Sequence, residues 1–300
     1  MSGKRIDEAT GTHTVGHEWD GIEELDTPLP RWWLLTFYAC IVFSIGYVVV
    51  YPAIPLVHGA TQGVWGWTSR GELSAEVRAE QVKHATINAA LSASPLDAIE
   101  GNANLRHQAI EGGKAAFRIH CTTCHGAGAA GGKGYPNLND DDWLWGGDVD
   151  AIHATISHGV RQSGDTASRM SQMPAFGRDG ILKPAEVQDV VSFVRAISHQ
   201  DASDSASARG AALFAANCAV CHGADGKGNR TLGAPNLTDP IWLYGGDRAS
   251  LTETVTNAHY GQMPNWGAQL DPVTLKMLAV YVHSLGGGEK APASVTPVAK

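Results

Sequence analysis

The longest apolar segment of the chain lies near its N-terminus, over residues 32–57, where no side chain carries a charge. A helix needs about 20 apolar residues to cross roughly 30 Å of hydrocarbon, and this segment supplies them. Aromatic residues near its two ends have the positions of interfacial belts, and the prolines that follow stop a helix. These aromatic residues and prolines are Trp32, Trp33, Tyr47, Tyr51, Pro52 and Pro55.

A cleaved signal peptide is the alternative interpretation of this segment. The apolar stretch of a signal peptide covers only about 7–15 residues after a short basic start, whereas residues 1–31 contain seven acidic side chains. We therefore expect an N-terminal segment over 1–31 and a retained transmembrane helix over 32–57. Three basic residues precede the helix and only Arg70 follows soon after it, which favours a cytoplasmic N-terminus.

Residues 58–107 are predicted to connect the anchor to the rest of the chain. Gly59 to Trp67 has the composition of a loop at the membrane interface. Glu72 to Leu105 is polar, rich in alanine and typical of a solvated helix. Neither stretch contains a pattern that indicates chemistry.

An internal repeat organises the remainder of the chain. The first copy contains CTTCHG, YPNL and LWGGD, and the second contains CAVCHG, APNL and LYGGD in the same order. Each copy then carries Gln-Met-Pro and ends in a helical apolar pattern, at 184–197 and 272–285. The polar stretch 200–208 is typical of a linker, so the predicted fold is mainly α with two tandem domains. The predicted boundaries are 108–199 for the first domain, 209–286 for the second and 287–300 for a flexible tail.

The cysteines narrow the function more than the composition does. A net charge of −8 argues against nucleic acid as a partner, because phosphates require a basic surface. Four of the five cysteines form two Cys-x-x-Cys-His strings, and the fifth, Cys40, is a small apolar residue of the predicted membrane helix. That string is the signature of covalent c-type haem attachment. A zinc site would need two further ligands for each thiolate pair, and a disulfide framework does not explain the adjoining histidine.

Each string supplies the covalent and proximal side of a haem site. Two thiols one helical turn apart can each form a thioether with a vinyl group of the porphyrin, and the adjacent imidazole then reaches the iron. The machinery that attaches haem to such strings works outside the bacterial cytoplasm, so the residues after the anchor are expected to face the periplasm. The predicted attachment residues are Cys121 and Cys124 for the first haem and Cys218 and Cys221 for the second, with His125 and His222 as proximal ligands.

Met173 and Met263 are the predicted distal iron ligands, because they recur at matched places and are followed by proline and an aromatic residue. Methionine opposite histidine raises the reduction potential relative to two histidines and closes the iron to oxygen. His158 and His259 are alternative ligands, whereas Met277 is expected to serve in packing. Each predicted methionine follows the string of its own repeat, but a pairing exchanged between the two haems also remains open.

Two further features are expected to support the haem sites. The Pro-Asn-Leu segments at Pro136 and Pro235 should pass near the proximal histidines, where a backbone carbonyl can accept the ring N–H and fix the ligand's orientation. Trp143 and Trp242 are expected to wall the two haem pockets. Both are packing roles rather than catalytic ones.

A Cys-x-x-Cys-His unit with a later Met-Pro and a final helix resembles the class I cytochrome c fold, and the chain contains it in tandem. The N-terminal part is more specific. HEWDGIEELDTPLPRWW (17–33), the single span, YPAIPL (51–56) and GWTSR (66–70) are similar to the di-haem subunit III of bacterial cbb3-type cytochrome c oxidases. The resemblance covers essentially the whole chain and implies two haem c groups in class I cytochrome c domains after one N-terminal transmembrane helix.

This resemblance implies an electron-transfer role in the bacterial inner membrane. In that family the subunit takes electrons from donor cytochromes c and passes them through a mono-haem partner subunit to the haem–copper core, where oxygen is reduced and protons are pumped. The chain would be no enzyme by itself, since it has one span and no copper-ligand histidine cluster. The segment 17–33 would dock against other subunits at the cytoplasmic face.

Two other functions remain open from the sequence. A membrane-tethered di-haem carrier could serve another reductase or a dehydrogenase, and a binding or assembly module could hold haem for a structural or sensory purpose. Methionine at both irons argues against gas sensing, which needs an open or labile iron position.

Overall fold

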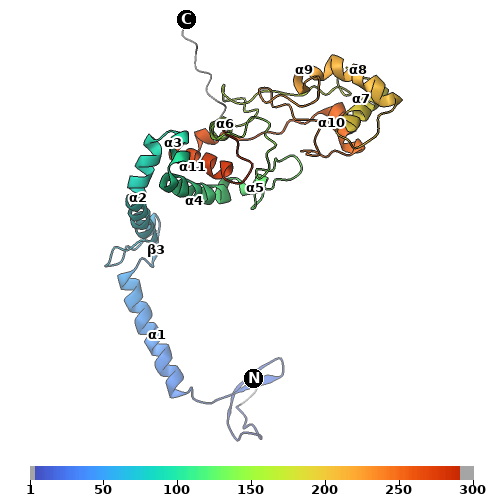
Figure 1. The fold of residues 1–300 in the computed structure, drawn as a ribbon. Coiled ribbons are helices and arrows are strands. Elements are labelled where there is room, and N and C mark those ends of the chain that lie inside the picture. Colours follow the sequence, from blue (N-terminus) through green and yellow to red (C-terminus); the bar gives the residue numbers. More distant parts are fainter. Residues whose placement is uncertain (1–3, 291–300) are drawn as a thin grey trace. The chain divides into compact units, whose positions relative to one another are not determined.

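Helices account for most of the secondary structure in residues 4–290, the part of the chain that this computed structural model describes (Figure 1). Within this part, the named strands form two short hairpins near the N-terminus. The chain divides into two units, Met1–Lys83 and His84–Lys300. The mainly α fold with one N-terminal apolar helix, expected from the sequence, is confirmed.

The first unit contains an antiparallel hairpin that was not predicted from the sequence. Strand β1 (Thr14–Trp19) pairs with β2 (Ile22–Leu25) around Asp20 and Gly21, whose φ angles are 51° and 85°. A two-residue hairpin loop with both φ angles positive is typical of a type I′ turn, and Asp-Gly is among its preferred sequences. The Asp-Gly dipeptide was the sequence feature from which this hairpin could have been predicted.

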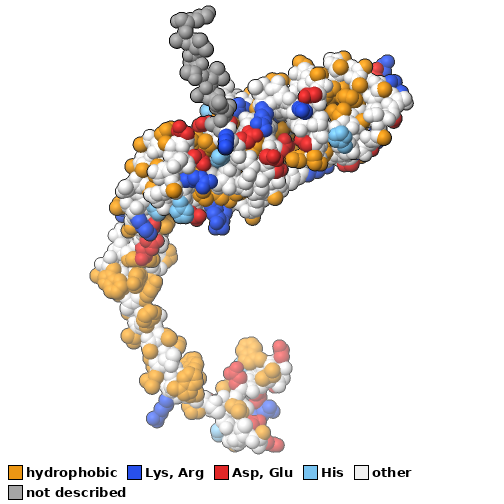
Figure 2. Space-filling model, in the orientation of Figure 1, with side chains coloured by type: hydrophobic (Ala, Val, Ile, Leu, Met, Phe, Trp, Pro, Cys, Tyr) orange, Lys and Arg blue, Asp and Glu red, His pale blue; other side chains and the backbone are white. Residues whose placement is uncertain are grey.

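Helix α1 (Arg31–Val50) has the 20 residues that a membrane span needs. It is apolar enough to cross a membrane, and 0% of its most apolar window is buried inside the molecule. Hydrophobic side chains cover this helix in Figure 2. The hydroxyls of Thr36 and Ser44 each donate to the carbonyl four residues earlier, so these polar groups are satisfied within the helix.

Helix α1 ends before the predicted span of 32–57 does, because the chain turns back after Val50. The amides of Val64 and Trp65 donate to carbonyls in the last turn of α1 and satisfy two acceptors that a helix end leaves open. Gly63 permits this return. Its φ is +68°, and a Cβ there would lie 2.2 Å from the Val50 carbonyl oxygen.

An aromatic cluster lies at this end of α1. The ring centroid of Tyr51 lies 5.4 Å from that of Trp65 and 5.6 Å from that of Trp67, in edge-on contacts. Between these residues in sequence, β3 (Pro55–Leu56) and β4 (Gly59–Ala60) form the second hairpin. Amphipathic rings at one end of an apolar helix are typical of a membrane–water interface.

Three helices occupy the stretch that was expected to be one solvated helix. They are α2 (Ser69–Ala93), α3 (Leu96–Gly101) and α4 (Ala103–His120). Pro95 precedes α3, where its fixed φ and missing amide suit a helix start. The side chain of Asn102 caps α4 by accepting hydrogen bonds from two amides of its first turn.

The two repeats fold into matching series of helices. Each series has a long helix before the Cys-x-x-Cys-His string, a single turn within the string, a helix after LWGGD or LYGGD, and a C-terminal helix. In the first repeat these are α4, α5 (Thr122–His125), α6 (Val149–His158) and α7 (Pro184–Ile197). In the second they are α8 (Ser205–Asn217), α9 (Ala219–His222), α10 (Arg248–Asn257) and α11 (Pro272–His283), with the 3-10 turn η1 (Trp266–Ala268) before α11.

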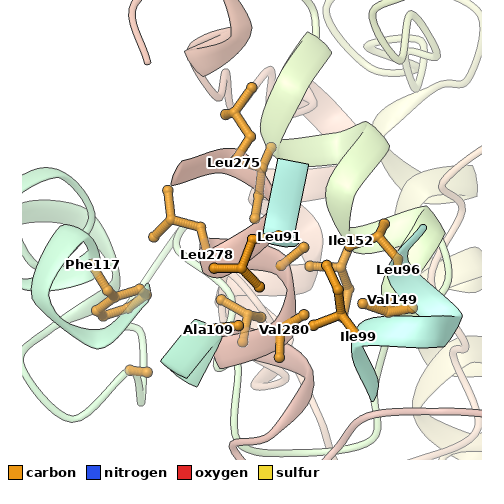
Figure 3. Packing of buried hydrophobic residues seen from close by; sticks show 14 residues of the cluster. Leu91, Leu96, Ile99, Ala109, Phe117, Val149, Ile152, Leu275, Leu278 and Val280 are labelled. Carbon is orange, nitrogen blue, oxygen red and sulfur yellow. The ribbon is translucent and has the colours of Figure 1, made fainter. Parts of the chain in front are cut away.

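The C-terminal helix of the second repeat packs on the first repeat. Helix α11 lies along α4 and contacts α6, and the buried side chains of these helices point toward one another in Figure 3. Phe117 on α4, Ile152 on α6 and Leu278 on α11 are buried together, with Leu91 of α2 and Ile99 of α3 completing the cluster. These residues and their neighbours form the first core.

The second core is built in the same way, with the roles of the two repeats reversed. Helix α7 of the first repeat packs along α8 and against α10 of the second, and Val190, Phe214 and Leu251 are buried between them. The two cores therefore do not coincide with the predicted domains at 108–199 and 209–286. Each core brings together the first three helices of one repeat and the last helix of the other.

Glycines on the two long helices allow this packing without selecting a partner. A Cβ at Gly113 would lie 2.1 Å from the Met277 carbonyl oxygen, and one at Gly210 would lie 2.0 Å from the Asp189 carbonyl oxygen. The helix backbones therefore approach closely at both crossings. The two glycines occupy the same place in the two repeats, so they do not distinguish one C-terminal helix from the other. The repeat pattern could not predict the exchange for this reason.

Hydrogen bonds hold the described part of the predicted tail at 287–300. The indole Nε1 of Trp143 donates to the Gly287 carbonyl oxygen at 2.7 Å. The Glu289 carboxylate pairs with Arg230, with 2.7 Å between the charged atoms. The tail from residue 291 onward lies outside the described residues.

Candidate functional site

The two Cys-x-x-Cys-His strings have the same backbone geometry. Cys121 separates α4 from α5 with φ −110° and ψ −26°, and Cys218 separates α8 from α9 with φ −112° and ψ −34°. The amides of the second cysteine and the histidine donate to the carbonyl of the first cysteine, at 3.2 and 2.9 Å in one string and 3.1 and 2.9 Å in the other. Residues three and four apart share one face of a helical turn, so both thiols and the imidazole lie on one face.

A backbone carbonyl orients the histidine of each string. Nδ1 of His125 lies 3.1 Å from the Pro136 carbonyl oxygen, and Nδ1 of His222 lies 3.0 Å from that of Pro235. With Nδ1–H donating, Nε2 is the nitrogen left to bind a metal ion. Burial lowers the pKa of both imidazoles, so they are neutral at pH 7, which is the form that binds metals. The predicted contacts with the two Pro-Asn-Leu segments are confirmed.

The thiols of the strings fit covalent attachment better than a zinc site. Burial raises the pKa of Cys121 and of Cys218 to about 11, so both are neutral thiols. The cysteines are free, and within residues 4–290 no three His, Cys, Asp or Glu side chains converge as a metal site would require. A thiol pair beside an oriented imidazole matches the requirements of a c-type haem.

The two predicted pocket tryptophans lie against the cores at matched positions. Trp143 packs against the first core and Trp242 against the second. A Cβ at Gly147 would lie 2.3 Å from the ring of Trp143, and one at Gly246 would lie 2.4 Å from that of Trp242. The glycines of LWGGD and LYGGD therefore make room for the two indoles, each beside the core that contains the first cysteine of its own repeat.

Each predicted methionine packs against the core that the first cysteine of the other repeat also joins or borders. Met263 packs against the first core together with Cys121. Met173 packs against the second core, which contains Cys218. Met277 packs against the first core from within α11, as expected for a packing residue. Each distal candidate therefore shares a core with the first cysteine of the opposite repeat.

The alternative histidine ligands have other partners. Nδ1 of His158 lies 3.0 Å from the Asp165 carboxylate, and this hydrogen bond lowers the pKa of Asp165. The ring of His259 stacks on that of Tyr244, with 3.9 Å between centroids.

Two contacts between the repeats were not predicted from the sequence. The ring centroid of His120, which directly precedes the first string, lies 5.3 Å from that of Trp266. The Arg161 guanidinium donates from Nη1 to the Gly261 carbonyl oxygen at 2.7 Å. An aromatic residue recurs after each Met-Pro, which indicated that Trp266 belongs to a haem site. The pattern did not indicate which of the two strings Trp266 lies near.

Three family models match this chain, one in the N-terminal segment and one in each repeat. The N-terminal domain of cytochrome oxidase-cbb3, FixP, matches residues 11–58. The cytochrome c family matches 110–198, and subunit III of cbb3-type cytochrome c oxidase matches 205–282. Both repeats are therefore cytochrome c domains in sequence, as the resemblance implied.

Individual relatives align with the chain over nearly its whole length. The cbb3-type cytochrome c oxidase subunit CcoP of Cereibacter sphaeroides is 54% identical over 92% of this chain and 95% of its own. The cbb3-type subunit FixP of Azorhizobium caulinodans is 52% identical over 95% of this chain and 96% of its own. The cbb3-type subunit FixP of a Bradyrhizobium species is 51% identical over 95% of this chain and 98% of its own. With a FixP-type N-terminal domain, two cytochrome c repeats and relatives that match it from end to end, this chain belongs to the CcoP/FixP family of cbb3-type cytochrome c oxidase subunits.

Proposed function

We propose that this chain is the di-haem electron-transfer subunit of a cbb3-type terminal oxidase and passes electrons from donor cytochromes c towards the oxygen-reducing haem–copper core. The observation that carries the proposal is the duplication of one geometry. Two strings present paired thiols and a carbonyl-oriented imidazole, and a methionine packs against each core. Iron held on both faces suits electron transfer, because an open position favours oxygen chemistry.

Each string would hold its haem by two thioether bonds and one bond to iron. A bound haem c supplies one-electron exchange between its ferric and ferrous states. The chain fixes the imidazole through the Nδ1–H bond to a carbonyl, which also makes Nε2 a better donor to the metal. The residues in these roles are Cys121, Cys124 and His125 for the first haem and Cys218, Cys221 and His222 for the second, with Met173 and Met263 as the distal ligands.

The apolar cores lie beside cysteines that would hold the two haems. Phe117 and Phe214 are 1% and 2% exposed. Cys121 packs against the core that contains Phe117, and Cys218 is buried in the core that contains Phe214. Such surroundings exclude water and lower the local dielectric, both of which shift the reduction potential of a haem. We therefore assign the cores a role in tuning potential as well as in folding.

The same proposal places α1 across the inner membrane, with the N-terminus in the cytoplasm and both repeats in the periplasm. Lys4, Arg5 and Arg31 precede the span, and the first basic residue after it is Arg70. Haem attachment to such strings takes place on the periplasmic side, which supports the same orientation. Electrons would leave through a mono-haem subunit of the complex, and the chain by itself would carry out no oxygen chemistry.

The β1–β2 hairpin supports a docking role for the N-terminal segment. Trp19 and Ile22, which flank its turn, are 67% and 70% exposed. Large exposed apolar side chains are typical of an interaction surface. We propose that this hairpin contacts other oxidase subunits at the cytoplasmic face.

Purification of the full chain from detergent-solubilised membranes tests the proposed function. We expect covalent haem on the chain after denaturing electrophoresis and co-isolation with a many-span subunit that contains haem and copper. The Cys218→Ser/Cys221→Ser variant should retain one haem and lose electron delivery from reduced donor cytochrome c. Cys40→Ala is the matched control, because Cys40 lies in α1 and belongs to neither string. Co-isolation with a dehydrogenase, without a haem–copper subunit, would refute the proposal.

A further inference from the structure

Two aromatic residues occupy matched positions in the repeats, Trp145 in LWGGD and Tyr244 in LYGGD. We propose that each is a positioning residue for the proximal histidine of the other repeat and thereby sets the reduction potential of that repeat's haem. Trp145 acts on His222, and the matched residue Tyr244 acts on His125. This inference rests on the proposed function, since it presupposes that both strings carry haem. It adds that each repeat contains a residue that adjusts the electron affinity of the other repeat's iron.

Trp145 of the first repeat contacts a loop of the second repeat. A Cβ at Gly233 would lie 2.1 Å from Cζ2 of Trp145, so the indole ring lies directly against the backbone of this glycine. Gly233 has a φ of +59°, which glycine adopts readily because it has no side chain. Pro235, whose carbonyl oxygen lies 3.0 Å from Nδ1 of His222, is two residues further along the chain. The indole therefore packs on the loop that supplies the hydrogen-bond acceptor of the imidazole.

This loop, residues 228–235, is closed by backbone hydrogen bonds and tied to the histidine. The amides of Asn229 and Ala234 each donate to the carbonyl of the other residue, at 2.9 and 3.0 Å. The Gly228 amide donates to the His222 carbonyl oxygen at 2.7 Å. A Cβ at Gly228 would lie 2.4 Å from the Ala234 carbonyl oxygen, so the two sides of the loop are in close contact. Displacement of the loop therefore changes the position of the proline carbonyl relative to the imidazole.

Tyr244 makes the reciprocal contact with the loop of the first repeat, residues 131–136. A Cβ at Gly134 would lie 3.2 Å from Cε1 of Tyr244, and the Gly134 amide donates to the Leu243 carbonyl oxygen at 2.8 Å. Pro136, whose carbonyl oxygen lies 3.1 Å from Nδ1 of His125, is again two residues further along the chain. The same position of each repeat thus contacts the same position of the other repeat's loop.

A side chain of its own repeat packs on each of the two aromatic rings. The Arg169 guanidinium lies over the ring of Trp145, 5.5 Å from its centroid, in the geometry of a cation–π interaction. The imidazole of His259 stacks on Tyr244 with 3.9 Å between centroids. Arg169 follows α6 and His259 follows α10 along the chain. Each ring is therefore held from its own repeat and can restrain the loop of the other.

The hydrogen bond from Nδ1–H to the proline carbonyl is the step through which this restraint reaches the iron. A carbonyl that accepts from Nδ1 makes Nε2 a stronger electron donor to the metal. Stronger donation favours the ferric state and lowers the reduction potential. Loss of the aromatic ring should loosen the loop, weaken this hydrogen bond and raise the potential of the haem on the other repeat.

Spectroelectrochemical titration of the full chain with only the second haem attached tests the role of Trp145. This form is Cys121→Ser/Cys124→Ser. Adding Trp145→Ala should shift the midpoint potential upward, whereas Trp145→Tyr, which introduces the aromatic residue of the second repeat, should shift it less. Tyr244→Ala is the matched control and should also have the smaller effect. An effect of Tyr244→Ala equal to or larger than that of Trp145→Ala would overturn the proposal.

The form with only the first haem, Cys218→Ser/Cys221→Ser, should show the opposite order. Tyr244→Ala should raise the potential more than Trp145→Ala does. Tyr244→Phe keeps the ring carbons that face the loop and should largely restore the parent potential. A lower unfolding midpoint without any change of potential would show that the two rings serve only in packing, and would overturn the proposal.

A second measurement uses the chain with both haems attached, because the double cysteine variants could fail to fold. Hydrogen–deuterium exchange of the backbone amides is compared between the two loops. Trp145→Ala should speed exchange in 228–235 more than in 131–136, and Tyr244→Ala should do the reverse. Equal effects on both loops would contradict the reciprocal contact.

The outcomes separate this inference from the proposed function. Covalent haem with potentials that neither alanine variant changes would overturn the positioning role and leave the proposed function intact. Absence of covalent haem from the unmodified chain would refute the proposed function, whatever the exchange rates of the two loops.

Discussion

Val160 and Met263 exchange both of their backbone hydrogen bonds, with N···O distances of 3.0 and 3.1 Å. Val160 follows α6 of the first repeat and Met263 precedes η1 of the second, so the pair lies where the two chain segments cross. Gly159 lets them meet, because a Cβ there would lie 2.3 Å from the Met263 carbonyl oxygen. The backbone of the second Met-Pro is thereby fixed on the first repeat.

This pairing makes the two repeats one structural unit. Each core draws helices from both repeats, so local unfolding of either repeat removes a helix from both cores. Regions that share a core open together, whereas independent domains open separately. We therefore expect the two haem sites to lose methionine ligation in one transition on denaturation. The methionine-to-iron charge-transfer absorption of the ferric protein can follow this loss.

Gly113→Ala should destabilise the fold at the first core. The new methyl group would lie 2.1 Å from the Met277 carbonyl oxygen, and overpacking of this kind costs about 1–3 kcal/mol. That cost exceeds the gain of about 1 kcal/mol in helix propensity from glycine to alanine. The unfolding midpoint in denaturant should fall. Gly128→Ala is the control, because a Cβ there meets nothing within 4 Å, and equal effects of the two changes would contradict the close crossing of α4 and α11.

Ile41→Asp should prevent stable anchoring of the chain. Ile41 lies near the middle of α1, and a carboxylate at the centre of a membrane helix costs about 2.5–3.5 kcal/mol in insertion. We expect the variant to move from the carbonate-washed membrane fraction to the soluble fraction. Val57→Asp is the matched control, because Val57 lies beyond the end of α1 and is 92% exposed. Retention of both variants in the membrane would argue against α1 as the anchor.

The sequence was sufficient for the helices and for the contacts within each string. Pro184 at a helix start and the apolar period after it predicted α7 with the bounds that the structure has. The Pro-Asn-Leu segments at Pro136 and Pro235 were predicted to pass near the proximal histidines, and in each segment the proline carbonyl lies within hydrogen-bonding distance of the ring Nδ1. These features depend on local spacing, which a single sequence displays directly.

The exchange of C-terminal helices could not be predicted in the same way. Tyr281 and Phe193 are both aromatic and occupy matched places, so each fits either of the glycine-containing long helices. The partner is selected by the path of the segments that cross near Val160, through backbone contacts that leave little trace in side-chain identity. The ion pair of Glu289 with Arg230 was also not predicted. The composition of the tail is typical of disorder, and composition gives no information on a single specific contact.

Asp201→Asn should weaken the second core. Asp201 accepts hydrogen bonds from Arg195 at 2.6 and 2.8 Å and from Arg248 at 2.8 Å, which joins α7 to α10. These bonds lower the pKa of Asp201 from 3.8 to about 2. A depressed carboxyl pKa stabilises the fold above the unfolded value and loses this effect as the pH falls through the folded value. The difference in unfolding midpoint from the parent chain should therefore shrink below about pH 4. Asp179→Asn, which breaks a pair exposed on both sides, should change little, and a pH-independent difference for Asp201→Asn would refute the role of its charge.

Asp142→Asn should stabilise the fold at neutral pH. Burial, together with the negative charges of Asp239 and Asp140, raises the pKa of Asp142 from 3.8 to about 6, although Arg230 acts in the opposite direction. A raised carboxyl pKa means that the fold disfavours the charged form, so this cost is absent below pH 3.8 and complete above about pH 6. After allowance for solvent screening we expect a gain of about 1 kcal/mol at pH 7 that vanishes near pH 4. Unfolding midpoints measured across this range check the sign. Glu111→Gln, which removes an exposed carboxylate on α4, is the control, and a gain for Asp142→Asn that persists at pH 4 would mean that repacking, rather than charge, is responsible.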